Sequence, residues 1–250
     1  MIQLKSQREI EIMAVGGKIL ADTVKLMEQS VKPGMTTADL DKIAEEFIRS
    51  HPGAKPSFKG LYNFPASICS SINHEIVHGI PSRKRVLYEG DVVSIDVGVF
   101  YEGYHTDSAT TVAVGAVDDE SRRLLQVTRD ALDAGVAVAR AGNHLGDIGA
   151  AVQEVVEAAG FSVVRDLVGH GIGTGFHEEP QVPNYGKPNR GIRLAPGLTI
   201  AIEPMVNVGK PGIRTMPDKW TVVTIDGKRS AHFEHTVAIT ENGPRVLTAA

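Results

Sequence analysis

The strongest constraint on the fold is a set of short segments that occurs twice along the chain. Lys32-Pro33-Gly34 matches Arg140-Ala141-Gly142, and an acidic residue followed by an aliphatic one lies five positions beyond each. Residues 89–96 and 196–203 also resemble each other, and both segments end in a carboxylate. A duplication of this kind predicts two similar halves, about 1–115 and 116–250, that pack around one site within a single domain.

Hydrophobic periodicity and turn signals give the elements of each half. Apolar residues with a 3.6-residue period predict helices at 8–30, at about 119–140 and at about 145–159. A further helix is predicted to begin after a cap at Thr36 or Thr37. Segments rich in Val, Ile and Thr predict strands at 91–100 and 106–114, and residues 52–66 are typical of a loop. Asp226-Gly227, between 219–225 and 229–240, predicts a hairpin. The order of elements favours an α+β fold.

Composition excludes several classes of protein. The net charge of −4 does not favour a nucleic-acid binder, and no apolar run approaches the roughly 18 residues of a membrane span. Cys69 is the single cysteine, so an intrachain disulfide and a cysteine-rich zinc site are both excluded. The charged amino-terminal segment lacks the apolar stretch of a secretory signal. We therefore expect a cytoplasmic protein.

Two aspartates lie in the predicted Val-rich strands. A hairpin that turns around Tyr101-Glu102 would place Asp96 directly opposite Asp107. Opposed side chains have Cβ atoms about 4.5–5.5 Å apart, and like charges in that position are destabilising. The pair therefore indicates a compensating cation. The alternative is a shifted register that leaves one aspartate solvated at an edge.

Other candidate residues are ambiguous when each is considered alone. Glu203 ends an apolar strand, where an unpaired carboxylate is uncommon, whereas strand alternation by itself favours a solvent-facing Glu234. His170 and His177 lie in the glycine-rich segment 168–177, which cannot form a stable helix. Its spacing matches neither the dinucleotide-binding fingerprint nor the P-loop. His78 is equally compatible with a core histidine.

Taken together, four carboxylates and a histidine form a hard, oxygen-rich set. Such ligands suit Mn, Fe, Co or Zn in a two-metal site better than a structural zinc. The charges agree with this interpretation, because two divalent cations would balance the four carboxylates Asp96, Asp107, Glu203 and Glu234.

The chain resembles a known family, the bacterial type I methionine aminopeptidases. The motifs that carry the resemblance run in order through the whole chain: Val77-His78-Gly79-Ile80-Pro81, Ile95-Asp96-Val97, Tyr104-His105-Thr106-Asp107, Gly169-His170-Gly171-Ile172-Gly173, Phe176-His177-Glu178, Ile202-Glu203-Pro204-Met205 and Phe233-Glu234-His235-Thr236. The resemblance implies the pita-bread fold, in which two pseudo-symmetric α+β halves enclose a dinuclear metal site.

The resemblance also implies a role for each site residue. Two divalent cations per chain (Co, Mn, Fe, Zn or Ni) would be bound by Asp96, Asp107, His170, Glu203 and Glu234, with Asp107 and Glu234 bridging both. His78 and His177 would hydrogen-bond the substrate during catalysis, and Glu203 would relay a proton. The methionine pocket would be lined by Phe64, Cys69, Phe176 and Trp220.

Four positions depart from the family pattern. Phe58 and Leu61 stand where relatives often carry Cys and Tyr, at the pocket wall. Ser94 and Gly98 flank Asp96 where relatives carry Asn and Thr.

The implied activity is removal of the N-terminal methionine from nascent proteins and peptides that have a small second residue. We expect a monomer that acts on N-terminal methionyl peptides in the cytoplasm and binds neither DNA nor membranes, with docking at the ribosome left open. The alternatives are a proline-specific aminopeptidase or prolidase, a binding protein of the same fold that has lost its metal, and a phosphoesterase. Prolidases usually carry a large additional N-terminal domain, and a phosphoesterase would be expected to have more cationic groups.

Overall fold

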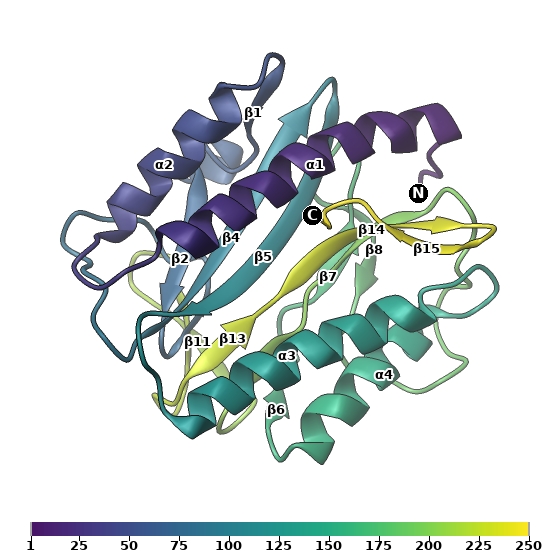
Figure 1. Cartoon of the computed structure of the whole chain (residues 1–250). Helices are drawn as coiled ribbons and strands as arrows, with labels where there is room; N and C mark the ends of the chain where they lie inside the picture. The colour runs from purple at the N-terminus through teal and green to yellow at the C-terminus, as the bar shows by residue number, and fades with distance from the viewer. Residues whose placement is uncertain (1, 250) are drawn as a thin grey trace.

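A computed structural model describes residues 2–249 and shows an α+β fold built on one large sheet (Figure 1). The sheet has nine strands in the order β1-β4-β5-β14-β9-β7-β8, with β2 paired to β4 and β15 paired to β14. Its strands are β1 (Ala54–Pro56), β2 (Ile68–Ile72), β4 (Val92–Tyr101), β5 (Tyr104–Ala113), β7 (Gly169–Gly171), β8 (Glu178–Val182), β9 (Thr199–Ile202), β14 (Glu234–Thr240) and β15 (Gly243–Val246).

Four helices and two smaller sheets complete the fold. The helices are α1 (Gln7–Ser30), α2 (Thr37–Arg49), α3 (Asp119–Val138) and α4 (Leu145–Ala158), with a short 3₁₀ turn, η1, at Leu61–Asn63. One small sheet contains β13 (Ser230–His232), β10 (Met205–Asn207) and β6 (Ser162–Val163), and the other contains β11 (Ile213–Thr215), β12 (Val222–Thr224) and β3 (Glu75–Val77).

The helices begin where the sequence provides capping residues. Thr36, not Thr37, is the N-cap of α2: its side chain accepts a hydrogen bond from the backbone of Asp39, whose carboxylate accepts one from the backbone of Thr36. Ser6 and Glu9 form the same reciprocal pair at the start of α1. Each pair satisfies donors that a helix end leaves without partners.

The helices cover one face of the large sheet and leave the opposite face for the site. Figure 1 shows α1 lying over β4 and β5, with α3 on the same side of the sheet. Because strand side chains alternate in direction, Ile95, Val97 and Val99 of β4 pack with Leu20 of α1 in a buried cluster. Asp96, between them in sequence, therefore points to the other face.

The register of the β4–β5 hairpin corrects the predicted opposition of the two aspartates. Tyr101 pairs with Tyr104, so Asp96 lies opposite Ala109 and not opposite Asp107. The turn uses Glu102 and Gly103, both with positive φ (44° and 94°), as a two-residue hairpin loop of this hand requires. The shift of two positions keeps the face of every side chain, so the aspartates remain diagonal neighbours on one face.

The hairpin predicted at Asp226-Gly227 is wrong. A turn is present, but β12 before it pairs with β11 and β3, whereas β13 after it pairs with β10. The Asp226 carboxylate accepts hydrogen bonds from the backbone of Lys210 and Lys228. Asp226 therefore closes a wider loop, and the chain leaves that loop toward a different sheet.

The connection that contains residue 116 joins β5 to α3. The strand pairs on either side of it, β4–β5 and β14–β9, lie in one continuous sheet in which β5 is adjacent to β14. The division of the chain into halves at this point stays a prediction.

Within residues 2–249 no helix has the length and apolar character needed to cross a membrane.

Candidate active site and metal centre

A single cavity of about 210 Å³ contains every residue that the sequence suggested for the site. An acidic end and an aromatic end share this cavity. Its lining residues are Phe58, Leu61, Tyr62, Phe64, Cys69, His78, Asp96, Asp107, His170, Phe176, His177, Glu203, Trp220 and Glu234.

The acidic end is assembled from strands that neighbour one another in the sheet. Asp96 and Asp107 come from β4 and β5, and Glu234 is the first residue of β14, where it pairs with Ala109. Glu203 follows β9 directly, and His170 is the middle residue of β7. The order of the strands thus brings together side chains that are more than a hundred residues apart in sequence.

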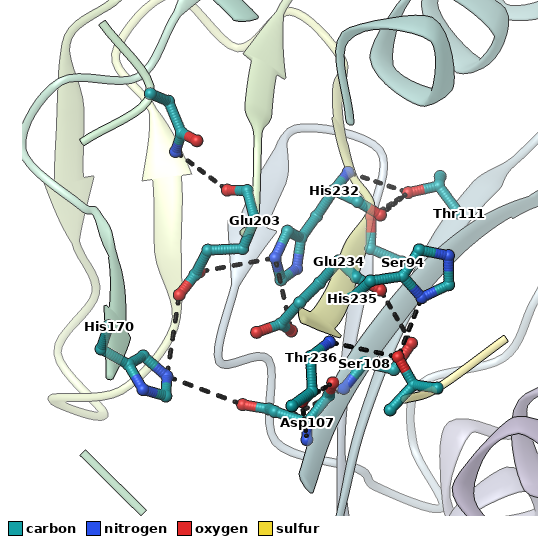
Figure 2. Close-up of polar contacts among 12 residues, drawn as sticks. Ser94, Asp107, Ser108, Thr111, His170, Glu203, His232, Glu234, His235 and Thr236 are labelled. Carbon is teal, nitrogen blue, oxygen red and sulfur yellow. Dashed lines mark hydrogen bonds and ion pairs between the residues drawn. The ribbon is translucent and has the colours of Figure 1, made fainter. Parts of the chain in front are cut away.

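The donor atoms lie close enough to share a cation. Figure 2 shows Nε2 of His170 between two carboxylates, 3.8 Å from Oδ2 of Asp107 and 3.8 Å from Oε1 of Glu203. One donor atom each from Asp107, His170 and Glu234 lies within 4.8 Å of the other two. Nδ1 of His170 donates to the carbonyl of Gly171 at 2.8 Å, which leaves the lone pair of Nε2 directed at the acidic cluster. This arrangement is typical of a metal-binding histidine.

Burial of several ionised carboxylates together costs folding free energy unless a cation balances their charge. Asp96, Asp107 and Glu234 are 8%, 4% and 1% exposed, and Oδ1 of Asp96 and Oε1 of Glu234 have no hydrogen-bond partner among the described residues. Desolvation raises the pKa of Asp96 to about 7. It raises the pKa values of Asp107 and Glu234 well above the ordinary range, and neighbouring carboxylates add to both shifts. Divalent cations would satisfy the orphaned oxygens and the charge.

Hydrogen bonds between β5 and β14 fix the two central carboxylates. The backbone N–H of Asp107 donates to Oγ1 of Thr236 at 2.8 Å, and that hydroxyl donates to the carbonyl of Asp107, also at 2.8 Å. The hydroxyl of Ser108 donates to the carbonyl of Glu234 at 2.7 Å. These hydrogen bonds of Thr236 and Ser108 hold together β5 and β14, the strands that carry Asp107 and Glu234.

The burial of Glu234 differs from what its alternation pattern favoured. The side chains of Glu234 and Val237 point to opposite faces of β14, as predicted. Both faces are covered by other parts of the protein, so Glu234 is buried and does not face solvent. Alternation gives the direction of a side chain, and the neighbouring elements decide what lies there.

The aromatic end of the cavity provides a pocket for an apolar side chain. The rings of Phe64 and Trp220 meet edge to face at 5.0 Å, and those of Phe58 and Phe176 do so at 5.3 Å. Cys69 is buried between the two ends, where burial raises the pKa of its thiol, and it contributes a neutral, polarizable wall.

Two of the departures from the family pattern, Gly98 and Phe58, lie against each other. A Cβ added at Gly98 would lie 2.8 Å from the Phe58 ring, 2.8 Å from Cβ of Ser57 and 3.1 Å from the Phe176 ring. Gly98 therefore makes the space that the Phe58 ring occupies. Ser94 hydrogen-bonds Thr111 at 2.8 Å, so its hydroxyl supports the strand pair.

We expect Gly98→Thr alone to destabilise the protein by about 1–3 kcal/mol, because overpacking forces neighbours out of position. Phe58→Cys removes one of the closest contacts, so the double variant should recover part of the loss, while the contact with Cβ of Ser57 remains. Chemical denaturation of the wild type, both single variants and the double variant measures the coupling. Strictly additive effects would contradict the proposed compensation.

Two histidines stand between the acidic and aromatic ends. Burial lowers the pKa of His177 to about 4, with a contribution from His170, and it also lowers the pKa of His78. Both rings are therefore neutral near neutral pH and can act as hydrogen-bond donors or acceptors. The ring of His78 meets Trp220 edge to face at 6.4 Å, and that of His177 meets His170 at 4.4 Å.

Two residues of the site were not predicted from the sequence. His232 is 1% exposed, and Figure 2 shows its ring between Glu203 and Glu234, with Nε2 3.6 Å and 4.0 Å from their carboxylates. Its spacing of two residues from Glu234 is a signal that strand alternation could have provided. Tyr62 lines the cavity from a loop whose sequence gives no comparable signal.

Comparisons with known proteins agree with this geometry. The family model described as metallopeptidase family M24 matches residues 11–241. A methionine aminopeptidase of Clostridium perfringens is 53% identical over 248 residues, which cover 99% of each chain. The chain belongs to metallopeptidase family M24, among the methionine aminopeptidases. The crystal structure of the methionine aminopeptidase of Thermotoga maritima superposes with a TM-score of 0.98 at 44% identity and covers 100% of both chains.

The same fold is found in a more distant structure. The prolidase of Pyrococcus horikoshii OT3 matches with a TM-score of 0.80 at 23% identity, over 99% of this chain and 63% of that structure. This likeness shows the shared fold alone. The fold and family expected from the sequence motifs are confirmed.

Because the family is one of metallopeptidases, we expect metal removal to destabilise the protein. A ligand that binds only the native state stabilises it by about 2.7 kcal/mol at a hundredfold excess over Kd. For a chain of this size that corresponds to roughly 5–10 °C in Tm. Calorimetry before and after chelation should show this loss, and Asp107→Asn should show a smaller one. Identical melting curves would contradict a shared metal site.

Proposed function

We propose that this protein hydrolyses the first peptide bond of chains that begin with methionine and have a small second residue. The observation that carries the proposal is the joining of a buried acidic cluster to an aromatic pocket within one cavity of about 210 Å³. A side chain of methionine size fits such a pocket, and contacts between sulfur and aromatic rings add about 0.3–1.5 kcal/mol. The names of the relatives support the same activity.

Five residues would hold two divalent cations. Asp96 would bind one ion, His170 and Glu203 the other, and Asp107 and Glu234 both. When bound, such ions lower the pKa of coordinated water and polarise the carbonyl that is attacked. The spacing of the donor atoms and the orphaned oxygens of Asp96 and Glu234 support this assignment.

Glu203 would act as the general base and proton relay. Its side chain is 14% exposed, so it is the most accessible of the four carboxylates to the cavity, and its backbone carbonyl is held by Asn184 at 2.9 Å. A carboxylate in this position can take a proton from the attacking water and deliver it to the leaving nitrogen.

His78 and His177 would hydrogen-bond the scissile amide. Both are neutral, and both lie between the apolar pocket and the acidic cluster. Neutral imidazole N–H groups aimed at the carbonyl stabilise the negative charge that develops during attack. His78 has a positive φ of 60°, and its neighbour Gly79 has no room for a side chain beside the carbonyl of Ser70. This backbone holds the His78 ring in place.

The three site histidines predicted from the sequence, His78, His170 and His177, should respond differently to substitution. His170→Ala should weaken metal binding, because a ligand is lost, whereas His78→Ala and His177→Ala should lower kcat with metal content nearly unchanged. Elemental analysis of the purified variants, together with steady-state kinetics, separates the two groups. Loss of metal from His177→Ala to the same extent as from His170→Ala would show that the division is wrong.

We also propose that the protein works as a monomer in the cytoplasm, on newly made chains. The substrate supports this location, because free N-terminal methionine arises during translation. The net charge of −4 gives no support for DNA binding. Sedimentation analysis of the purified protein tests the monomeric state.

The function is tested by release of free methionine from Met-Ala-Ser across a metal series, after dialysis against a chelator. We expect release with at least one of Mn, Fe, Co, Zn or Ni. Selective turnover of Ala-Pro-Ser without action on Met-Ala-Ser would move the protein to the prolidase side of the fold. Metal binding without turnover of either peptide would favour a binding protein.

A further inference from the structure

The loop at residues 58–64 forms one wall of the cavity and is firmly anchored at both ends. Phe58 and Phe64 are 6% and 4% exposed, and their rings meet edge to face at 6.4 Å. Between them the backbone bonds to itself, from Gly60 N–H to the carbonyl of Phe64 at 2.9 Å and from Leu61 N–H to that of Phe58 at 2.9 Å. The loop is therefore a compact turn with two buried ends and an exposed tip.

The backbone at the tip is strained. Tyr62 has φ 48° and ψ 28°, and Asn63 has φ 69°, both in the left-handed region. A bulky residue such as tyrosine is uncommon there, because its Cβ crowds the backbone. Strain of this kind persists where surrounding structure imposes it, and it is concentrated at functional sites. Tyr62 is also 63% exposed, so burial of its ring does not explain the conformation.

The strained backbone places the Tyr62 ring against His177. The two rings are stacked, with centroids 5.7 Å apart and planes 15° apart. The Tyr62 hydroxyl lies 3.3 Å from Nδ1 of His177. Within residues 2–249 the His177 ring has no other hydrogen-bond partner. Tyr62 thus contacts the face of the imidazole and one of its two nitrogens.

We propose that Tyr62 is a positioning residue that sets the orientation and tautomer of His177. We assign the hydroxyl as the donor to Nδ1, because a phenol O–H is a stronger donor than a neutral imidazole N–H and the imidazole nitrogen is the stronger acceptor. The ring hydrogen is then on Nε2, the other ring nitrogen. Only this tautomer lets His177 donate to a substrate through Nε2. The inference rests on the proposed role of His177 as a substrate hydrogen-bond donor.

The chemistry of a neutral imidazole makes such a partner useful. In the neutral state that the proposed donor role requires, the His177 ring has one hydrogen and two nitrogens that could carry it. The group that bonds one nitrogen decides the state of the other. Stacking fixes the ring plane, and the hydroxyl fixes the tautomer.

Tautomers are measured directly by two-bond ¹H–¹⁵N spectra of ¹⁵N-histidine-labelled protein. The His177 signals are assigned from their absence in His177→Gln. We expect the Nε2–H form in the full-length, metal-free wild type and a larger Nδ1–H fraction in Tyr62→Phe, which keeps the stacking and lacks the hydroxyl. Tyr88→Phe is the matched control, because Tyr88 is 66% exposed and lies outside the cavity.

Kinetics on Met-Ala-Ser provide the second measurement. Loss of one neutral hydrogen bond should lower kcat of Tyr62→Phe about three- to tenfold with KM nearly unchanged. Tyr62→Ala should lower kcat further, because stacking is also lost, and Tyr88→Phe should match the wild type.

A wild-type His177 in the Nδ1–H form, or a Tyr62→Phe variant with the wild-type tautomer and wild-type kcat, would overturn the inference. The spectra need no turnover and no variant of Tyr62 to reveal the wild-type tautomer. Failure of the positioning role is therefore distinguishable from failure of the proposed function, which would appear as absent methionine release by the wild type.

Discussion

Glu203→Gln should lower the turnover of Met-Ala-Ser by about 10²–10⁴-fold, which is the usual cost of losing a general base. The amide keeps the shape of the side chain and one oxygen for metal binding, but it cannot accept the proton of the attacking water. The two carboxylate oxygens of Glu203 lie 3.8 Å and 3.6 Å from Nε2 of His170 and His232, so the side chain lies within the acidic cluster.

Single-turnover kinetics and elemental analysis of the same preparation test this prediction. At least one metal ion should remain bound while turnover is lost, so that lost catalysis is separated from a lost cofactor. Glu241→Gln, at an exposed turn outside the cavity, is a control for the change of charge and should be fully active. Full activity in Glu203→Gln would remove this residue from the mechanism.

The second residue of the substrate should change kcat/KM by about a hundredfold between alanine and phenylalanine. His78 and His177 must come within hydrogen-bond reach of the scissile amide, and an ångström-scale displacement can cost about that factor. The cavity that holds both histidines has a volume of about 210 Å³, which leaves little space beside the scissile amide. A bulky second side chain would therefore hold the amide away from the reacting groups.

Competition between Met-Ala-Ser and Met-Phe-Ser in one reaction measures this ratio directly. Met-Gly and Met-Ser peptides should behave like Met-Ala-Ser, and Met-Lys and Met-Glu peptides like Met-Phe-Ser. Equal kcat/KM values for the alanine and phenylalanine peptides would contradict the proposed position of the amide in the cavity.

Strand alternation predicted the site better than it predicted the strand register. The predicted opposition of Asp96 and Asp107 is wrong by two residues, because the turn uses Glu102 and Gly103. A shift of two keeps every side chain on its face, so the acidic face of the sheet was still predicted. The same reasoning gave the direction of Glu234, but it could not show what covers that face.

Features that depend on tertiary contacts were outside the reach of local patterns. Asp226-Gly227 has the composition of a hairpin turn, yet the carboxylate of Asp226 bonds a distant loop and the strands around it join different sheets. Gly98 and Phe58 appear as unrelated departures in sequence, and only their contact shows that one makes room for the other. The stacking of Tyr62 on His177 likewise joins segments 115 residues apart.

We propose that the buried carboxylates and His170 act by holding catalytic metal ions. A titration of chelated, metal-free protein with Mn²⁺ or Co²⁺ tests this role, with bound metal and methionine release from Met-Ala-Ser recorded on the same samples. We expect no release without metal, release that rises with metal occupancy, and two ions bound per chain at saturation. Full methionine release by protein shown by elemental analysis to contain no metal would contradict this role.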